Sequence, residues 1–127
     1  MDETQLPGLV VLTRAQNGMA IVTTPATVDL MNEEEFERKL LAAAALSQVV
    51  IVDATATFFS VKAMRTLNDV GRMIDDGGGE LRVVIVKACV RYYLEVANCH
   101  RCLRIFPSIY HALRVPHRDR QPLLAAA

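Results

Sequence analysis

The stretch from Val49 to Asp76, VVIVDATATFFSVKAMRTLNDVGRMIDD, decides the fold. It begins with consecutive β-branched residues, a pattern typical of a strand that is buried on both faces of a sheet covered by helices. Ser60 can cap a helix that follows. Apolar residues then recur at the spacing of one helical face, at Met64, Leu67, Val70 and Ile74. The stretch therefore predicts a strand, a loop and a helix.

Two adjacent aromatic residues, Phe58 and Phe59, lie between this strand and this helix. Open α/β sheets usually place their binding surface at the carboxyl ends of the strands, where the helices begin. We therefore expect function at this position. Each phenylalanine is also compatible with a core role, in which its ring covers the end of the sheet.

The segments upstream predict a hairpin and a helix. Two extended runs, residues 9–14 and 19–24, flank Asn17-Gly18, a dipeptide that favours a tight hairpin turn. Asn32 and Glu35 have the spacing of a capping pair before a helix over residues 33–46.

Downstream, three consecutive glycines over residues 77–79 end the central helix. They follow a helix and precede a strand, whereas a phosphate-binding loop has the reverse order, so we interpret them as a helix terminator. The remaining pattern predicts a strand over 81–86, a helix over 88–98, a short strand over 103–106 and a last helix over 107–114.

Composition limits the class of protein. The chain has 127 residues, of which 52% are hydrophobic and 22% charged, and its formal net charge is zero. These values fit one globular domain and argue against a nucleic-acid partner, which favours a basic surface. Charges interrupt every apolar run, so we expect a cytoplasmic protein without membrane insertion. The predicted boundaries are a flexible lead-in over 1–8, a domain over 9–115 and a disordered tail over 116–127.

The order of these elements, together with residues of the carboxyl-terminal half, resembles the STAS domain family, named for sulfate transporters and anti-sigma factor antagonists. The matching positions in VRYYLEVANCHRCLRIFPSIYHAL are Leu94-Glu95, Arg101, Pro107-Ser108 and Ala112-Leu113. The resemblance implies an α/β fold: a single STAS-like domain with a mixed four- to five-stranded sheet and about four helices, packed mainly on one face. It also implies a binding protein that is not an enzyme.

The family's functional motif differs in this sequence. Bacterial antagonists of this type carry Asp-Ser-Ser/Ala-Gly at the start of the second helix, and a partner kinase phosphorylates the first serine. Anchored on Phe58, the alignment places Ser60 on the aspartate, Val61 on the phosphoacceptor and Lys62 on the next residue. A shifted gap would place Ser60 on the acceptor instead, but it would turn the apolar face of the helix by about 100°. We therefore predict that the serine phospho-switch is lost.

The resemblance implies binding to the histidine-kinase-like ATPase domain of an anti-sigma factor, which frees a sigma factor for transcription. The candidate contact residues are Phe58, Phe59, Ser60, Val61 and Lys62. The alternative is a STAS accessory subunit of a membrane transport complex, such as a lipid ATP-binding cassette transporter. Formation of a homodimer also stays open.

Three cysteines, Cys89, Cys99 and Cys102, are a second set of candidate functional residues. Cys99 and Cys102 form a CxxC pair, which can be redox-active or half of a zinc site. This pair follows a helix and precedes a strand, whereas a thioredoxin-like pair begins a helix, and no second pair of metal ligands has the required spacing. We favour small buried residues over a thiol switch. No acid, base and nucleophile occur at informative spacing, so neither a metal, a cofactor nor catalysis is predicted.

Overall fold

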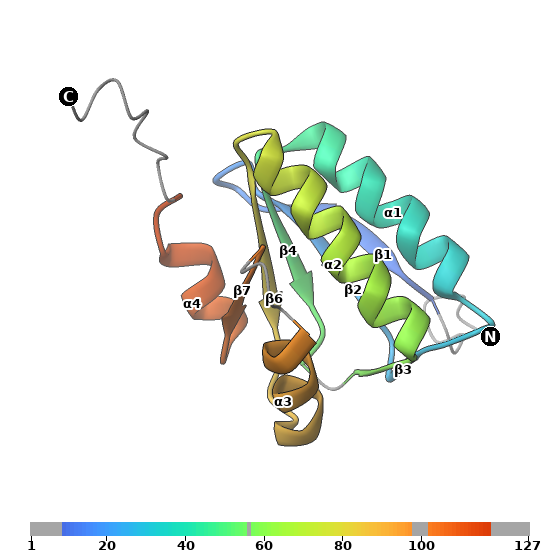
Figure 1. Ribbon diagram of the computed structural model, residues 1–127. Coiled ribbons are helices and arrows are strands. Elements are labelled where there is room, and N and C mark those ends of the chain that lie inside the picture. Colours follow the sequence, from blue (N-terminus) through green and yellow to red (C-terminus); the bar gives the residue numbers. More distant parts are fainter. Residues whose placement is uncertain (1–8, 56, 98–101, 118–127) are drawn as a thin grey trace, which may run out of the picture.

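The computed structural model describes residues 9–55, 57–97 and 102–117. These residues form one sheet with helices on both faces, and a small second sheet at one end (Figure 1). The elements follow in the order β1 (Val11–Arg14), β2 (Ala20–Thr23), β3 (Thr27–Val28), α1 (Glu33–Leu46), β4 (Val49–Asp53), β5 (Phe58–Phe59), α2 (Val61–Asp76), β6 (Glu80–Val84), α3 (Ala88–Ala97), β7 (Leu103–Phe106) and α4 (Ile109–Arg114).

The main sheet has five strands in the order β1-β2-β4-β6-β7. β1 runs antiparallel to β2, whereas the other neighbours are parallel. The predicted hairpin is confirmed, and Gly18 at its turn has a positive φ of 88°, which glycine adopts without steric cost. The mixed five-stranded sheet agrees with the expected fold class.

The central strand, β4, is covered on both of its faces, as its run of β-branched residues predicts. Val50 and Val52 belong to the apolar cluster that includes residues of α1 and α2. Ile51 points the other way and packs in a second cluster with Phe106 and Ala112. Side chains alternate between the two faces of a strand, so consecutive apolar residues indicate that both faces of this strand are covered.

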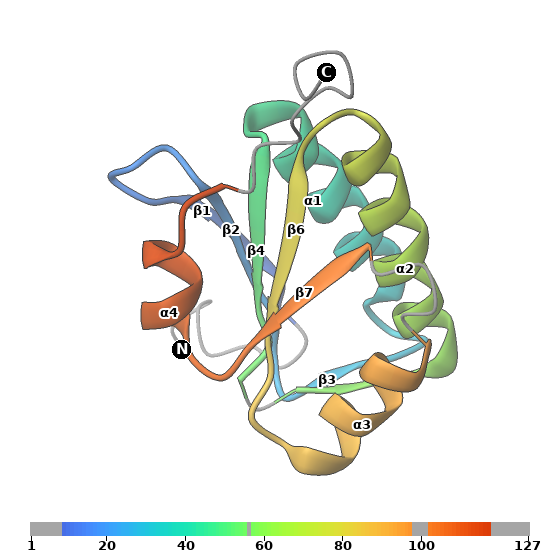
Figure 2. The same ribbon diagram turned by 60° about the vertical axis from the view of Figure 1, so that its left-hand side comes forward.

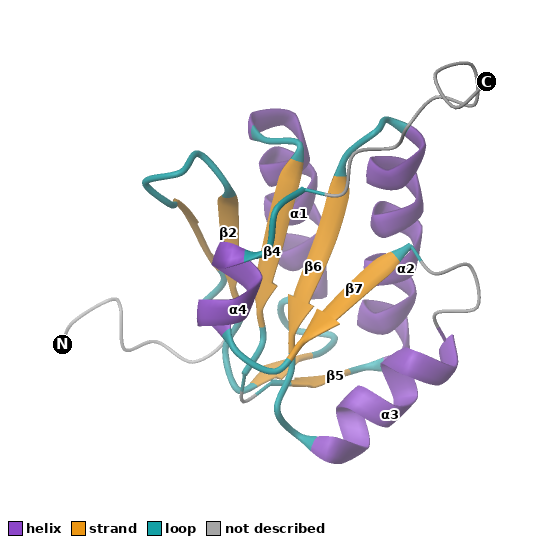
Figure 3. Cartoon of the chain, turned by 90° about the vertical axis from the view of Figure 1, so that its left-hand side faces the viewer, coloured by secondary structure: helices purple, strands orange, loops and turns teal. Residues whose placement is uncertain are grey.

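The helices are distributed unequally between the two faces of the sheet. α1 and α2 lie side by side on one face, and α4 lies on the other (Figures 1 and 2). α3 lies beyond the carboxyl end of β6, and its Val90 and Leu94 join the cluster of α1 and α2. The prediction that the helices pack mainly on one face is confirmed (Figure 3).

The three glycines act as the predicted terminator of α2, which ends at Asp76. Gly78 has a φ of 85°, and the amide of Gly79 donates to the carbonyl of Ile74 at 2.8 Å. A Cβ at Gly79 would lie 2.5 Å from the carbonyl oxygen of Gln48, which is closer than a Cβ carbon can approach a backbone oxygen. Glycine is therefore required where the chain enters β6.

The capping pair predicted for α1 does not form. Asn32 is the N-cap residue, but its side chain makes no capping hydrogen bond to the helix. Its amide oxygen accepts from the backbone N–H of Asp29 at 2.8 Å, and its amide nitrogen donates to the carbonyl of Thr27 at 2.9 Å. The side chain instead satisfies backbone groups of the preceding turn, which would otherwise lack partners at a part-buried site.

Two short strands, β3 and β5, have no counterpart in the sequence prediction. Each has two residues, too few for an alternating pattern of apolar and polar side chains. The predicted strand over 81–86 is also displaced, because β6 begins at Glu80 and ends at Val84.

Candidate functional site

The pairing of β3 with β5 positions the candidate site. The amide of Phe58 donates to the carbonyl of Ala26 at 2.9 Å, and the amide of Ser60 donates to the carbonyl of Val28 at 2.8 Å. This parallel pairing holds the chain just before α2 against the chain just before α1. The amino ends of the two helices are therefore neighbours.

Ser60 caps α2, as its sequence position predicts. Its hydroxyl oxygen accepts from the backbone N–H of Ala63 at 3.0 Å, and the same hydroxyl donates to Oε2 of Glu33 at 2.9 Å. Glu33 is the first residue of α1, and only 6% of its surface is exposed. Its carboxylate thus lies where two helices begin, and the positive ends of both helix dipoles stabilise a negative charge there.

Lys62 is the only cation that pairs with this carboxylate among the described residues. Its Nζ lies 3.6 Å from Oε1 of Glu33, and its side chain is 65% exposed. The ammonium group is therefore available to a partner as well as to Glu33.

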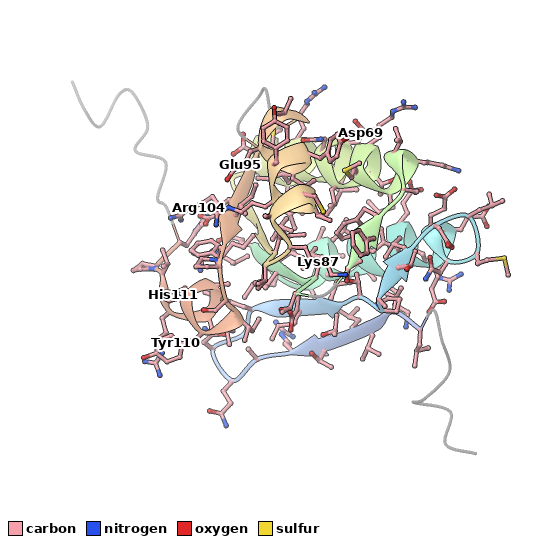
Figure 4. The ribbon with its side chains drawn as sticks, turned by 90° about the horizontal axis from the view of Figure 1, so that it is seen from below. Asp69, Lys87, Glu95, Arg104, Tyr110 and His111 are labelled. Carbon is pink, nitrogen blue, oxygen red and sulfur yellow. The ribbon has the colours of Figure 1, made fainter. Side chains whose placement is uncertain are left out.

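The two adjacent phenylalanines have different environments. The ring of Phe59 packs against the core, with its centroid 5.7 Å from that of Phe36. Phe58 is 46% exposed, and Nζ of Lys87 lies 3.5 Å from its ring centroid, a cation–π contact. Seen from the carboxyl ends of the strands, Lys87 lies toward the centre of the molecule, whereas Tyr110 and His111 lie at its periphery (Figure 4). Phe58 is the surface residue of the pair.

Val61, the first residue of α2, is 69% exposed although it is apolar. Three further apolar residues are exposed in loops at this end of the sheet: Leu30, Met31 and Val86. We call these three residues, together with Phe58 and Val61, the apical surface. It is defined as Leu30, Met31, Phe58, Val61 and Val86. Phe58 and Val61 line one groove, and large apolar groups exposed at the same end of a domain are candidates for a protein interaction site.

A groove of about 660 Å³ adjoins the apical surface, between α2 and α3. Its lining residues are Phe58, Phe59, Val61, Met64, Arg65, Asn68, Arg72, Cys89, Val90 and Tyr93. Sequence reasoning had selected the first three of these and Cys89. It missed the others because the contact between α2 and α3 is tertiary, although the spacing of Arg65, Asn68 and Arg72 marks one polar stripe of a helix.

The described cysteines are both free thiols. Cys89 is exposed in the wall of the groove, whereas Cys102 is buried before β7. Cys99 lies outside the described residues, so the geometry of the CxxC pair does too. Within the described ranges, no three potential metal ligands form a cluster, and no helix has the length and apolarity needed to span a bilayer.

Comparisons with known proteins agree on the fold. The model of the family described as STAS domain matches residues 11–112. A solved anti-sigma factor antagonist from Mycobacterium paratuberculosis superposes with a TM-score of 0.71 and 17% identity, over 83% of this chain and 90% of that chain. An anti-sigma-factor antagonist (STAS) domain protein from Planctomyces limnophilus gives a TM-score of 0.68 and 18% identity, over 82% of this chain and 93% of that chain.

A domain of the murine anion transporter Slc26a9 also has this fold. The superposition gives a TM-score of 0.59 and 19% identity, and it covers 84% of this chain but 21% of the transporter. Among curated proteins, no sequence matches the chain. At these identities the solved structures show a shared fold, which free-standing regulators and transporter domains both use.

Proposed function

Because the chain belongs to the STAS domain family, we propose that it is a non-enzymatic regulator of the anti-sigma factor antagonist type. It binds the histidine-kinase-like ATPase domain of an anti-sigma factor and so releases a sigma factor. The observation that carries this proposal is the apical surface, where Phe58 and Val61 are exposed at the start of α2. The fold that the chain shares with anti-sigma factor antagonists supports it.

The apical surface has the composition of a binding site. A large aromatic ring and branched aliphatic groups supply most of the binding energy in many protein interfaces. Here the ring of Phe58 is held by Lys87, and Val61 is fixed at the start of a capped helix. Since a β-branched valine in a helix and a phenylalanine ring have few rotamers, a partner that covers them loses little side-chain entropy.

We further propose that this regulator lacks the serine phospho-switch. In the alignment Val61 occupies the acceptor position, and valine has no hydroxyl group. Ser60, the adjacent hydroxyl, is engaged with Ala63 and with the carboxylate of Glu33. A phosphate on Ser60 would bring a charge of about −1.5 to −2 beside that buried carboxylate, where repulsion opposes it.

Binding to purified ATPase domains of anti-sigma factors from the same genome tests the first part of the proposal. We expect Val61→Asp to weaken binding by about 30-fold or more, the effect of losing one dominant interface residue. The matched control is Met73→Asp, which introduces the same charge at a half-exposed position of the same helix, away from the apical surface. Calorimetric titration measures both affinities. Equal affinities for the two variants would overturn the proposed surface.

Incubation with the cognate ATPase domain and ATP tests the second part. We expect the intact mass of the protein to stay unchanged, because Val61 cannot accept a phosphate and Ser60 is capping α2. Peptide mass spectrometry locates any added group. A phosphate on Ser60 would show that the shifted alignment is the correct one.

The membrane transport alternative predicts a different partner. Affinity capture with the chain as bait, followed by mass spectrometry, would then retain transporter subunits and no kinase-like ATPase. Capture with and without reductant also tests the cysteines, since a thiol switch requires that retention of the partner depend on the reductant.

A further inference from the structure

The groove between α2 and α3 has an apolar interior and an open mouth. Its deeper walls include the buried Val90 and the partly buried Phe59 and Met64. Phe58 and Tyr93 contribute exposed aromatic rings to its rim. The volume of about 660 Å³ lies within the range of small-molecule sites, which are typically apolar with a few polar groups that orient the ligand.

The guanidinium and amide groups of the groove come from one stripe of α2, whereas α3 contributes the thiol of Cys89 and the hydroxyl of Tyr93. Arg65, Asn68 and Arg72 follow at spacings of three and four residues, so they point to one side of the helix. The two arginines are about 10 Å apart along the helix axis. Asp69 lies between the two arginines on this face, four residues after Arg65 and three before Arg72, but it forms no ion pair with either and is not part of the lining.

The stripe carries two guanidinium groups and, between them, the single carboxylate of Asp69, so its positive charge is only partly balanced. Neither Arg65 nor Arg72 makes an ion pair or hydrogen bond with another described residue, and no carboxylate occurs among the lining residues. Arginine presents a planar set of donors that matches a carboxylate in a bidentate geometry. An apolar groove with two guanidinium groups on one wall, neither of them in an ion pair with a described residue, complements a molecule with an apolar body and an anionic head.

We propose that this groove binds a single-chain amphiphilic carboxylate of the fatty-acid type. The chain lies against Phe59, Met64 and Val90, and the carboxylate meets Arg65 or Arg72. We favour a small molecule over a partner helix because the volume is typical of a ligand site and both guanidinium groups lie on one wall, where they can hold a single anionic head group.

Occupation of the groove has a consequence for the apical surface. Phe58 and Val61 belong both to that surface and to the lining of the groove. A bound acyl chain would cover part of the area that a protein partner needs. The ligand would thus regulate partner binding by competition, in place of phosphorylation.

Titration of the isolated chain with decanoate, below its micelle concentration, tests the proposal without any protein partner. Calorimetry should show saturable binding with one site per chain. Decanol, which has the same chain without the charge, should bind at least about tenfold more weakly, because a charge-assisted hydrogen bond is lost. Equal binding of decanol, or no saturable binding of decanoate, would overturn the proposal.

The reactivity of Cys89 gives a readout at the groove itself. This thiol is exposed in the wall, so a bound chain should slow its alkylation, measured by peptide mass spectrometry. Decanoate that binds without protecting Cys89 would place the site elsewhere and overturn the proposal.

The double variant Arg65→Gln/Arg72→Gln tests the head-group contact. We expect about tenfold weaker binding of decanoate, and an unchanged affinity in the control Arg38→Gln, an exposed arginine of α1. Equal loss in both would indicate a nonspecific charge effect and overturn the assignment. Tighter association with anionic phospholipid vesicles than with monomeric decanoate would do so as well, because the occupant would then be a membrane surface. Since no ATPase domain is present in these assays, their failure leaves the proposed antagonist function standing.

Discussion

Two buried glutamates, Glu33 and Glu80, lie in charged clusters that differ in how the negative charge is balanced. Glu80 is 7% exposed and accepts from Nε of Arg82 at 2.8 Å and from Nη1 of Arg104 at 2.7 Å. Glu33 is 6% exposed and receives the hydroxyl of Ser60, with the ammonium of Lys62 at 3.6 Å. The Glu80 cluster lies under α4, and the Glu33 cluster lies where α1 and α2 begin.

The cluster under α4 holds the fold together. Arg82 is completely buried, and its Nη1 donates to the carbonyl of Ala112 at 2.5 Å, which ties α4 to the sheet. The guanidinium groups of Arg82 and Arg104 also lie 5.5 and 5.2 Å from the ring centroid of Phe106. Both arginines of this cluster therefore contact other groups of the fold, the carbonyl of Ala112 or the ring of Phe106, as well as Glu80.

The cluster at Glu33 instead shapes a surface. Its carboxylate is satisfied by a hydroxyl and by the helix ends, and Lys62, its cationic partner within the described part of the chain, extends into solvent. The carboxylate of Glu80, paired with the buried Arg82 and the partly buried Arg104, holds elements of the fold together, whereas that of Glu33 orders the edge of the surface that we propose as a binding site.

The largest expected effect on stability comes from removing the carboxylate of the Glu80 cluster. Glu80→Ala leaves Arg82 buried without its ion pair, and breaking a buried pair from one side costs about 3–5 kcal/mol. Urea denaturation measures the change in the free energy of unfolding. Glu37→Ala, at an exposed position of α1, is the control and should change it by less than about 0.5 kcal/mol. A loss below about 1 kcal/mol for Glu80→Ala would contradict the role of the Glu80 cluster in stabilising the fold.

The sequence predicts the secondary structure around this cluster but not the cluster itself. The predicted strand over 81–86 overlaps β6, which begins one residue earlier, at Glu80, and ends at Val84. The complete burial of Arg82 was not predicted because, apart from Glu80, the groups that contact it are distant in sequence. Arg104 bonds to Glu80 across 24 residues, and the carbonyl of Ala112 lies 30 residues from Arg82. Only the pairing of β6 with β7 and the position of α4 bring them together.

The candidate site was predictable to the extent that it is local. Ser60 as a cap follows from its place before an amphipathic helix. Its bond to Glu33 spans 27 residues and depends on the pairing of β3 with β5, two strands without a sequence pattern. Which of the two phenylalanines is exposed also depends on contacts from elsewhere, namely those of Phe36 and Lys87.

An intermediate effect is expected from a second carboxylate at the Glu33 cluster. Ser60→Asp keeps a side chain that can cap α2, but it replaces a donor to Glu33 with a like charge. Two such charges about 4 Å apart repel by about 1–4 kcal/mol, depending on how far water screens them. We expect the free energy of unfolding, measured in urea, to fall within that range.

A double-mutant cycle separates this repulsion from a loss of the cap. Combining Ser60→Asp with Glu33→Gln removes the like charge and should recover most of the lost stability. If the double variant is as unstable as the sum of the two single variants, the cost comes from the cap and not from the pairing of Ser60 with Glu33.

The smallest expected effect is at Lys62. Exposed ion pairs contribute between about 0 and 1 kcal/mol, and this one is 65% exposed on the lysine side, so Lys62→Gln should change the free energy of unfolding by less than about 0.5 kcal/mol. A loss above 1 kcal/mol would make the Glu33 cluster structurally equivalent to that of Glu80. If stability is unchanged while the affinity for an ATPase domain falls, the ammonium contacts the partner directly, because no change in the fold remains to explain the loss.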